Sequence, residues 1–352
     1  MSDYILSTIE PNDRRAMAQL DALLAQEGIR RDGHLDHTVG LYDQDYDLAA
    51  TGSCFGNTLR CMAVDSAHQG EGLMNQVVSE LVDFQCRRGN THLFLYTKCG
   101  KIPIFSGLGF YEVARAEGQA AFLENRRTGF ADYLTGLKNE TARSGLTGTM
   151  QGAVVLNANP FTLGHQYLLE QAAERCDLLH VFVVSEDVSL VPLAVRERLV
   201  REGSTHLKNL VYHQTGSYMI SSATFPSYFL KDEDDVITAH ARLDIAVFVK
   251  IARALGISRR FVGEEPFSRV TSIYNQVMVQ GLAGAGVDCT VFPRKAAGGR
   301  AVSASRAREL LRDGDFEALA PLVPKSTLHY FTSSQAEPVL ARIRRADDVV
   351  HY

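Results

Sequence analysis

The segment from Gly152 to Leu169 constrains the fold more than any other part of this 352-residue chain. An apolar, β-rich run ends at Asn157, and Pro160 and Gly164 then supply a tight turn before an apolar helical pattern begins. This order predicts a buried strand, a turn and a helix, with His165 at the junction. Backbone N–H groups at the start of a helix carry roughly half a positive charge. The segment therefore favours an anion-binding site, suited to a triphosphate, beside His165.

Composition narrows the class of protein. The chain is 45% hydrophobic and 22% charged, as expected for a globular protein, and its length favours two domains. No stretch approaches the ~20 apolar residues that span a bilayer, and the first residues lack the features of a signal peptide, so we expect a cytoplasmic location. Six cysteines without a C-x-x-C pair indicate neither a zinc site nor a disulfide framework. A net charge of −5 argues against nucleic acid as the main partner.

Beyond residue 150, strand-like runs alternate with helical patterns, which predicts a Rossmann-like, doubly wound parallel sheet in an α/β domain over residues 151–352. Ligands of such sheets bind at the carboxyl ends of the strands. The expected elements include Ala153–Asn157, His165–Glu174, Leu178–Val184, Leu193–Gly203, Leu210–His213, Ala239–Leu255, Arg260–Val262, Ser272–Leu282, Cys289–Phe292 and Ser303–Arg312. The polar, glycine-bearing stretch 126–150 is predicted to be a linker, with a short helix over Thr128–Lys138.

Residues 1–125 have a different order of expected helices and strands. The expected elements are a helix at Asp13–Gln26, strands at His37–Leu41, Leu48–Phe55 and Thr58–Val64, a helix at Met74–Arg87 and a strand at His92–Thr97. This order resembles the mixed α/β fold of the GCN5-related N-acetyltransferases. Their pyrophosphate-binding loop would correspond to Gln69, Gly70 and Gly72, although Met74 stands where that family has a small residue. A glycine turn that merely opens a helix is the alternative.

A second motif lies far from His165 in the sequence. In the stretch from Ala301 to Leu311, Ser303 or Ser305 is expected to cap a helix, and Arg308 would lie on its first turns, where it can meet the β- and γ-phosphates. An ordinary serine-capped helix with surface arginines is the alternative.

Four further residues are secondary candidates. Gly263 and Glu264 follow an expected strand and could touch adenine, ribose or magnesium, with helix capping by the glutamate as the alternative. Arg196 at a helix start and Lys231 at the end of an aromatic- and hydroxyl-rich passage are candidates for phosphate or carboxylate contact, and a surface role is equally open for each.

The spacing Thr162-x-Gly164-His165 resembles the H-x-G-H signature of the nucleotidyltransferase superfamily, with threonine in place of the first histidine. The stretch from Ser303 to Arg308 resembles the I-S-S-T-x-x-[RK] signature of the same superfamily. Together with the acetyltransferase-like N-terminal part, these motifs resemble the citrate lyase ligase family over nearly the whole chain.

The resemblance implies an acid-thiol ligase. ATP, acetate and the thiol of the coenzyme A-like prosthetic group on the citrate lyase acyl carrier subunit would give acetyl-thioester, AMP and pyrophosphate, with Mg²⁺ as a cofactor. Catalytic roles fall on His165 and Thr162, and nucleotide contacts on Asn159, Phe161 and Gly164. Two alternatives remain open: an adenylyltransferase acting on a phosphorylated small molecule, and a non-catalytic nucleotide or acyl-CoA sensor.

Overall fold

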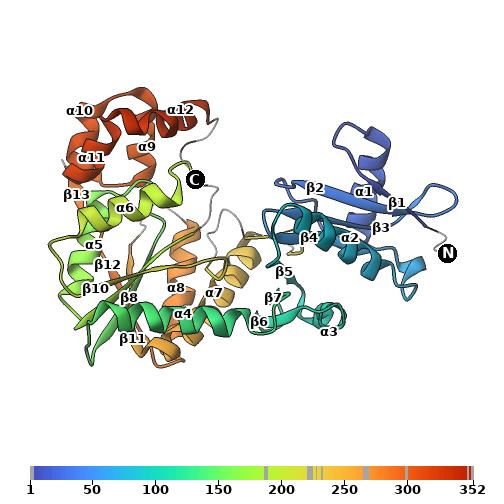
Figure 1. Cartoon of the computed structure of the whole chain (residues 1–352), viewed down its shortest axis with the longest axis horizontal. Helices are drawn as coiled ribbons and strands as arrows, with labels where there is room; N and C mark the ends of the chain where they lie inside the picture. Colours follow the sequence, from blue (N-terminus) through green and yellow to red (C-terminus); the bar gives the residue numbers. More distant parts are fainter. Residues whose placement is uncertain are drawn as a thin grey trace. The chain divides into compact units, whose positions relative to one another are not determined.

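The computed structural model describes residues 4–185, 189–219, 225–226, 228–230, 233–264, 269–297, 300–346 and 349. The chain forms two compact units (Figure 1). Unit 1 comprises Met1–Phe130 and Pro226–Ala239, and unit 2 comprises Ala131–Phe225 and His240–Tyr352. A segment from the second half of the sequence therefore returns to the first unit.

Unit 1 is built on a seven-stranded sheet of order β1-β2-β3-β4-β5-β7-β6. Its strands are β1 (Ile5–Thr8), β2 (His37–Tyr42), β3 (Leu48–Phe55), β4 (Thr58–Val64), β5 (Phe94–Thr97), β6 (Tyr111–Ala116) and β7 (Ala120–Glu124). The helices are α1 (Arg14–Gln26), α2 (Leu73–Arg87) and α3 (Ile102–Gly107). This architecture confirms the acetyltransferase-like mixed α/β fold, and the strands β1, β6 and β7 were not among the predicted elements.

The parallel strands β4 and β5 are paired over only a short length. The two strands pair only at Thr58 with Phe94 and at Leu59 with Leu95. Beyond these residues no further pairing between them is formed in the described chain, so the strands separate and their carboxyl ends leave space between them. On one face of the sheet, α2 packs Val77 against Gly52, where a Cβ atom would lie 2.4 Å from Val77 Cγ1.

Unit 2 contains a five-stranded, fully parallel sheet of order β10-β9-β8-β11-β12. Its strands are β8 (Gln151–Leu156), β9 (Leu178–Val183), β10 (Leu210–Gln214), β11 (Ile257–Gly263) and β12 (Asp288–Phe292). The helices are α4 (Gly129–Ser144), α5 (Leu163–Ala173), α6 (Leu193–Gly203), α7 (Glu233–Leu255), α8 (Arg269–Ala283), α9 (Ala304–Asp313), α10 (Phe316–Leu319), α11 (Lys325–Phe331) and α12 (Glu337–Arg345). Two of these helices cross the boundary between the units, since α4 and α7 both begin in unit 1 and end in unit 2.

The predicted strand–helix alternation of the second half is confirmed, and the element bounds differ by a few residues. All six residues of β9 are buried, as a strand covered on both faces requires. The expected short helix over Thr128–Lys138 is longer, because α4 continues through the polar stretch to Ser144.

A chain of four polar side chains, buried at its two central histidines, crosses the sheet of unit 2. His180 Nε2 lies 2.9 Å from Gln151 Oε1, His180 Nδ1 lies 2.9 Å from His213 Nε2, and His213 Nδ1 lies 2.6 Å from Glu140 Oε2. Burial lowers the pKa of His180 to about 3 and that of His213 to about 4, and it raises the pKa of Glu140. If the Gln151 oxygen accepts and both histidines are neutral, the chain needs its last proton on Glu140.

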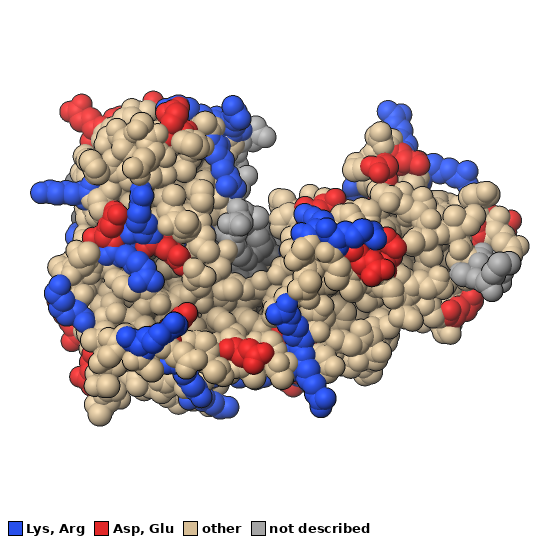
Figure 2. Space-filling view, viewed as in Figure 1, with Lys and Arg blue, Asp and Glu red and all other residues tan. Residues whose placement is uncertain are grey.

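The face of the molecule drawn in Figure 2 shows no single dominant charge. Lysine, arginine and acidic side chains are interspersed over the face drawn in Figure 2. Within the described residues, no helix combines the length and the apolar character needed to cross a membrane.

Candidate functional site

Thr162 and His165 form a reciprocal cap at the start of α5. The His165 backbone N–H points at Thr162 Oγ1 over 3.5 Å, while the Thr162 backbone N–H donates to His165 Nδ1 over 3.0 Å. Thr162 Oγ1 also lies 2.9 Å from His165 Nδ1. The structure therefore brings the two predicted catalytic residues together, with the threonine orienting the imidazole.

This geometry determines which nitrogen of the His165 imidazole carries the proton. A backbone N–H can only donate, so His165 Nδ1 must be the acceptor, and the proton of the neutral ring resides on Nε2. Desolvation, with smaller contributions from the positive charges of Arg294 and Arg308, lowers the pKa of His165 to about 4. At neutral pH the ring is a neutral hydrogen-bond donor through Nε2–H.

The two sequence motifs meet at Gly164. A Cβ atom on this glycine would lie 3.3 Å from the Val302 carbonyl oxygen, so the start of α5 and the residue before the α9 cap approach closely. Ser303 caps α9, because its Oγ accepts a hydrogen bond from the Arg306 backbone N–H over 3.1 Å. Of the two serines proposed as caps, Ser303 therefore has this role, and Ser305 contacts Arg308 instead.

Arg308 lies at the junction, but its hydrogen bonds are made within the protein. Only 2% of its surface is exposed. Nη1 donates to the Asn159 carbonyl over 2.6 Å, Nη2 donates to Ser305 Oγ over 3.2 Å, and Nε donates to the Val349 carbonyl. The sequence predicted direct contact with the β- and γ-phosphates. This geometry favours a positioning role, in which Arg308 holds the Asn159 turn against α9.

The structure excludes one of the two roles left open for Arg196. It is fully buried, so the surface role is wrong. Its Nη1 donates to the Asn157 carbonyl over 2.9 Å and to the Val184 carbonyl over 2.7 Å, and Nε donates to the Val191 carbonyl over 2.9 Å. Arg196 therefore links the chain segments that leave β8 and β9 through their backbone carbonyls.

The turn between β8 and α5 carries a buried polar donor. Asn159 is 2% exposed, and its Oδ1 accepts from the Val191 backbone N–H over 3.0 Å. Its Nδ2 finds no hydrogen-bond partner among the described residues. An unsatisfied buried donor costs about 1–3 kcal/mol, so a phosphate or carboxylate oxygen reaching this amide would gain a partner there.

Phe161, predicted to contact the nucleotide, belongs to the core instead. It is fully buried, and it fills the space beside Gly203, where a Cβ atom would lie 2.5 Å from the Phe161 ring. Its ring stacks with that of His165, with centroids 5.9 Å apart. Phe161 therefore supports the imidazole from the protein interior.

Gly263 and Glu264 lie at the carboxyl end of β11, on the same edge of the parallel sheet as the Asn159 turn. The Glu264 backbone N–H donates to the Phe292 carbonyl over 2.8 Å, and Arg294 Nε donates to the Glu264 carbonyl over 3.0 Å. The predicted candidate Lys231 lies outside the described residues.

Arg294 is a residue that the sequence reasoning missed. It follows β12, it interacts electrostatically with His165, and desolvation lowers its pKa. The signal was the basic pair Arg294-Lys295 directly after an expected strand of the parallel sheet. Within the described part of the chain, no three His, Cys, Asp or Glu side chains are grouped closely enough to hold a metal ion.

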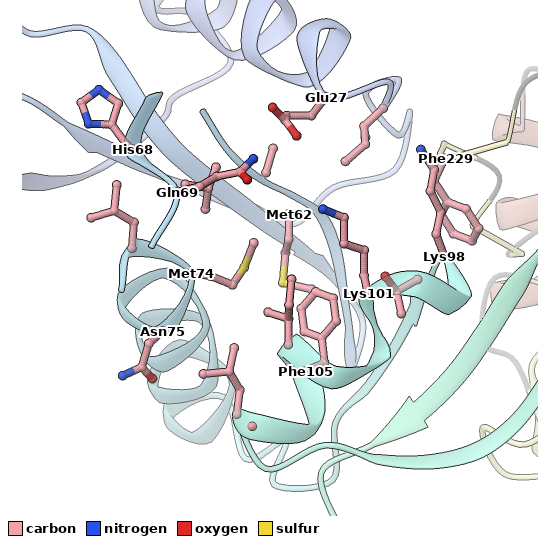
Figure 3. Close-up of a pocket in the computed structure, with 18 of the residues that line it drawn as sticks. Glu27, Met62, His68, Gln69, Met74, Asn75, Lys98, Lys101, Phe105 and Phe229 are labelled. Carbon is pink, nitrogen blue, oxygen red and sulfur yellow. The ribbon is translucent and has the colours of Figure 1, made fainter. Parts of the chain in front are cut away.

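Unit 1 contains a pocket of about 540 Å³, between the separated ends of β4 and β5 (Figure 3). Met62 and Val64 line it from β4, Tyr96 from β5, and Phe105 from α3. Its volume lies within the range of small-molecule sites, and its walls are mostly apolar.

The predicted loop residues Gln69, Gly70 and Gly72 all line this pocket, and so does Met74. Gly72 is the N-cap of α2 with a φ of +79°, a left-handed conformation that favours glycine. No side chain caps this helix, so its first N–H groups face the loop. Lys98 and Lys101 also line the pocket, and neither is paired with a carboxylate in the part of the chain that the structure describes.

Comparison with known proteins agrees with this architecture. Residues 151–331 match the family model of the citrate lyase ligase C-terminal domain. The chain is 38% identical over 323 residues to the [citrate [pro-3S]-lyase] ligase of Klebsiella pneumoniae, covering 90% of this chain and 93% of the relative. It is 36% identical over 335 residues to that of Escherichia coli (strain K12), covering 93% of each.

Two solved structures similar to part of the chain are acetyltransferases. One is the ribosomal-protein-S18-alanine N-acetyltransferase from Escherichia coli, with 17% identity, 34% of this chain and 92% of that chain covered, and a TM-score of 0.29. Another is the Escherichia coli GNAT family N-acetyltransferase YhbS in complex with CoA, with 21% identity, 36% and 82% covered, and a TM-score of 0.29. On the sequence relatives and the family model, the chain belongs to the citrate lyase ligase family of enzymes.

Proposed function

We propose that this enzyme uses ATP and acetate to acetylate the thiol of the prosthetic group on the citrate lyase acyl carrier subunit, and so activates citrate lyase. Its relatives are named [citrate [pro-3S]-lyase] ligase, and the match covers 93% of the E. coli relative's length. The structural observation that supports the proposal most is the meeting of the two motif halves at Gly164, around a neutral histidine at a helix start.

The need for ATP follows from the chemistry of acetate. A carboxylate resists attack by a thiol, because neither oxygen is a good leaving group. In the first step an acetate oxygen forms a bond to the α-phosphorus while the bond from that phosphorus to pyrophosphate breaks. The product is acetyl-adenylate, in which AMP is the leaving group for the thiol. Such a step depends mainly on positioning and on stabilising charge.

The residues at the carboxyl edge of the sheet fit this step. His165 would donate its Nε2 proton to an oxygen of the α-phosphate, aided by the open N–H groups of α5. Asn159 would donate its unsatisfied Nδ2 to the same anionic groups. Arg294 would contact the departing pyrophosphate, while Arg308 and Ser303 hold α9 in place. Glu264, at the carboxyl end of β11, would be the carboxylate that holds magnesium together with the substrate phosphates, and the ion would supply shielding of the pyrophosphate charge.

In the second step the thiol attacks the acyl carbon, the bond to AMP breaks and the thiol proton leaves to solvent. A free thiol with a pKa of roughly 8.5 is only a few per cent ionised at pH 7. The pocket of unit 1 would bind the coenzyme A-like arm that carries this thiol, with its phosphate at the Gln69–Gly72 loop. This part of the proposal gives the acetyltransferase-like unit a holding role.

The decisive experiment measures pyrophosphate release from ATP and magnesium, with and without acetate and with the deacetylated carrier subunit as thiol. Release that needs acetate, with acetyl transfer to the carrier, is the expected result. Release that instead needs a phosphorylated small molecule would replace the proposal by an adenylyltransferase. Nucleotide binding without release under any of these conditions would replace it by a sensor.

A further inference from the structure

One wall of the unit 1 pocket comes from a remote part of the sequence. Tyr228 and Phe229 line the pocket, although every other lining residue lies between Glu27 and Leu108. Together with Leu230 they form a short segment, here named the aromatic strap, which belongs to unit 1. The N-terminal part of the chain alone therefore does not complete the pocket.

The aromatic strap is held by specific contacts. The Arg30 backbone N–H donates to the Tyr228 carbonyl over 2.7 Å, and Arg30 Nη2 donates to the Leu230 carbonyl over 3.3 Å. The Tyr228 hydroxyl is hydrogen-bonded to the Cys61 backbone, and burial raises its pKa. Tyr228 is 6% and Phe229 is 5% exposed. The strap is therefore a fixed wall with both aromatic rings turned into the protein.

Cys61 connects this wall to the sheet. It has a φ of +50° on β4, next to the shift in register between β3 and β4. Its Sγ accepts from the Asp32 backbone N–H over 3.4 Å, and Asp32 pairs with Arg60 over 2.6 Å. The strap thus rests against an irregular, rigidly held point of the strand that lines the pocket.

The two ends of the pocket differ in chemistry (Figure 3). Gln69, Met74 and Asn75, at the loop and the start of α2, lie at one end, and Phe229 lies at the opposite end beside Lys98. Anionic groups are favoured at the uncapped start of α2. A phosphate-bearing arm that enters at α2 would therefore extend its uncharged terminus toward the strap.

We propose that Tyr228 and Phe229 determine the specificity of this pocket: they admit a phosphate-bearing arm that ends in a thiol or a short acyl thioester, and they exclude longer acyl chains. The inference rests on the proposed function for the identity of the arm. It adds that the limit on acyl length lies in unit 1, and that a segment from the second half of the chain imposes it. An extended acyl chain would have to displace a ring that the protein already holds in place.

Isothermal titration calorimetry with the full-length enzyme tests this, with coenzyme A, acetyl-CoA and hexanoyl-CoA as probes. We expect wild type to bind the first two with similar affinity and hexanoyl-CoA at least tenfold more weakly. Phe229→Ala opens the wall and should reduce this discrimination to about threefold or less, since each added methylene is worth on the order of 1 kcal/mol once it can be buried. Phe229→Leu, which keeps an apolar side chain, should give an intermediate ratio if Phe229→Ala does not fold.

Phe84→Ala is the matched control. Phe84 is a partly buried phenylalanine of α2 that stacks on His37 and does not line the pocket, so its loss should leave the discrimination unchanged. Equal wild-type affinity for acetyl-CoA and hexanoyl-CoA, or unchanged discrimination in both Phe229 variants, would overturn the inference.

Acetylation of the carrier with ATP and acetate is measured on the same wild-type preparation. If the carrier is acetylated but none of the three probes binds, the inference is wrong and the ligase activity stands. If the probes bind with the expected discrimination but no acetylation occurs, the ligase proposal is wrong and the length limit of the pocket stands.

Discussion

We propose an anion at the start of a helix in both candidate sites, but the two sites are built differently. In unit 2, α5 is capped by its own Thr162 and His165, and the surrounding arginines are held by backbone carbonyls. In unit 1, α2 begins at a glycine without a side-chain cap and opens onto an apolar pocket with exposed lysines. A site that stabilises charge in a reaction needs donors held in advance, whereas a site that holds a long arm needs space and apolar surface.

The largest effect is expected for His165, and it distinguishes the reaction site of unit 2 from the arm-binding site of unit 1. His165→Ala removes the Nε2–H donor, and we expect acetate-dependent pyrophosphate release to fall by about 10²–10³-fold, as for loss of one preorganised donor. Coenzyme A binding to unit 1 should not change. The exposed His329 is the matched control, and His329→Ala should be as active as wild type. A wild-type rate of pyrophosphate release in His165→Ala would show that the site in unit 2 does not use His165 to stabilise charge in the reaction.

Acid should destabilise unit 2 through His180 and His213, which are neutral when folded. Their folded pKa values, about 3 and about 4, lie below the unfolded value near 6.5, so the unfolded state binds more protons between these limits. The contribution of these two histidines to the free energy of unfolding is fully present above pH 6.5. It should fall by a few kcal/mol as the pH approaches 4. Thermal unfolding between pH 7.5 and 4.5 measures this.

Glu140→Gln tests the direction of the hydrogen bonds in the same chain. An amide NH₂ can donate to His213 Nδ1 as a protonated carboxyl would, so the variant should be about as stable as wild type at pH 7. Glu140→Leu leaves His213 without this partner and should lose about 1–3 kcal/mol. Equal stability of the two variants would contradict the assigned protons.

A smaller effect is expected for Arg294. Arg294→Gln removes the charge near His165, and the KM for ATP should rise by about 10-fold, the lower range for a charge-assisted contact. Arg312→Gln changes an exposed arginine of α9 and should leave the KM unchanged. A rise only in the KM for acetate would indicate that Arg294 contacts the acetate carboxylate and not the pyrophosphate.

The smallest effect concerns the loop of unit 1. Gly72 has a φ of +79° and open space around its Cα, so Gly72→Ala should cost on the order of 1 kcal/mol through strain alone and weaken coenzyme A binding several-fold. Gly89→Ala is the matched control, because Gly89 has a φ of +84° and does not line the pocket. It should lose similar stability without any change in binding.

The sequence predicted the fold class and both glycine-bearing helix starts, because these follow from local periodicity and turn chemistry. The sequence could not show which arginines bind ligand and which hold the fold together. Arg196, Arg308 and Arg294 are equally charged in the sequence, but only packing decides that the first two are buried against carbonyls. Phe161 was similarly ambiguous, since an aromatic residue beside a phosphate-binding turn can face either the ligand or the core.

By itself the sequence determined the alternation of strands and helices, the anion-favouring turn at His165 and the resemblance of its two distant motifs, since each depends on neighbours along the chain. Only the tertiary structure decided that the motifs meet at Gly164, that His165 is neutral with its proton on Nε2, and that Tyr228 and Phe229 complete a pocket in unit 1. The meeting at Gly164 and the wall of the pocket arise from contacts between residues far apart in sequence, and the neutral imidazole arises from desolvation. The position of its proton follows from the geometry of the Thr162–His165 cap, which the residue types alone do not specify.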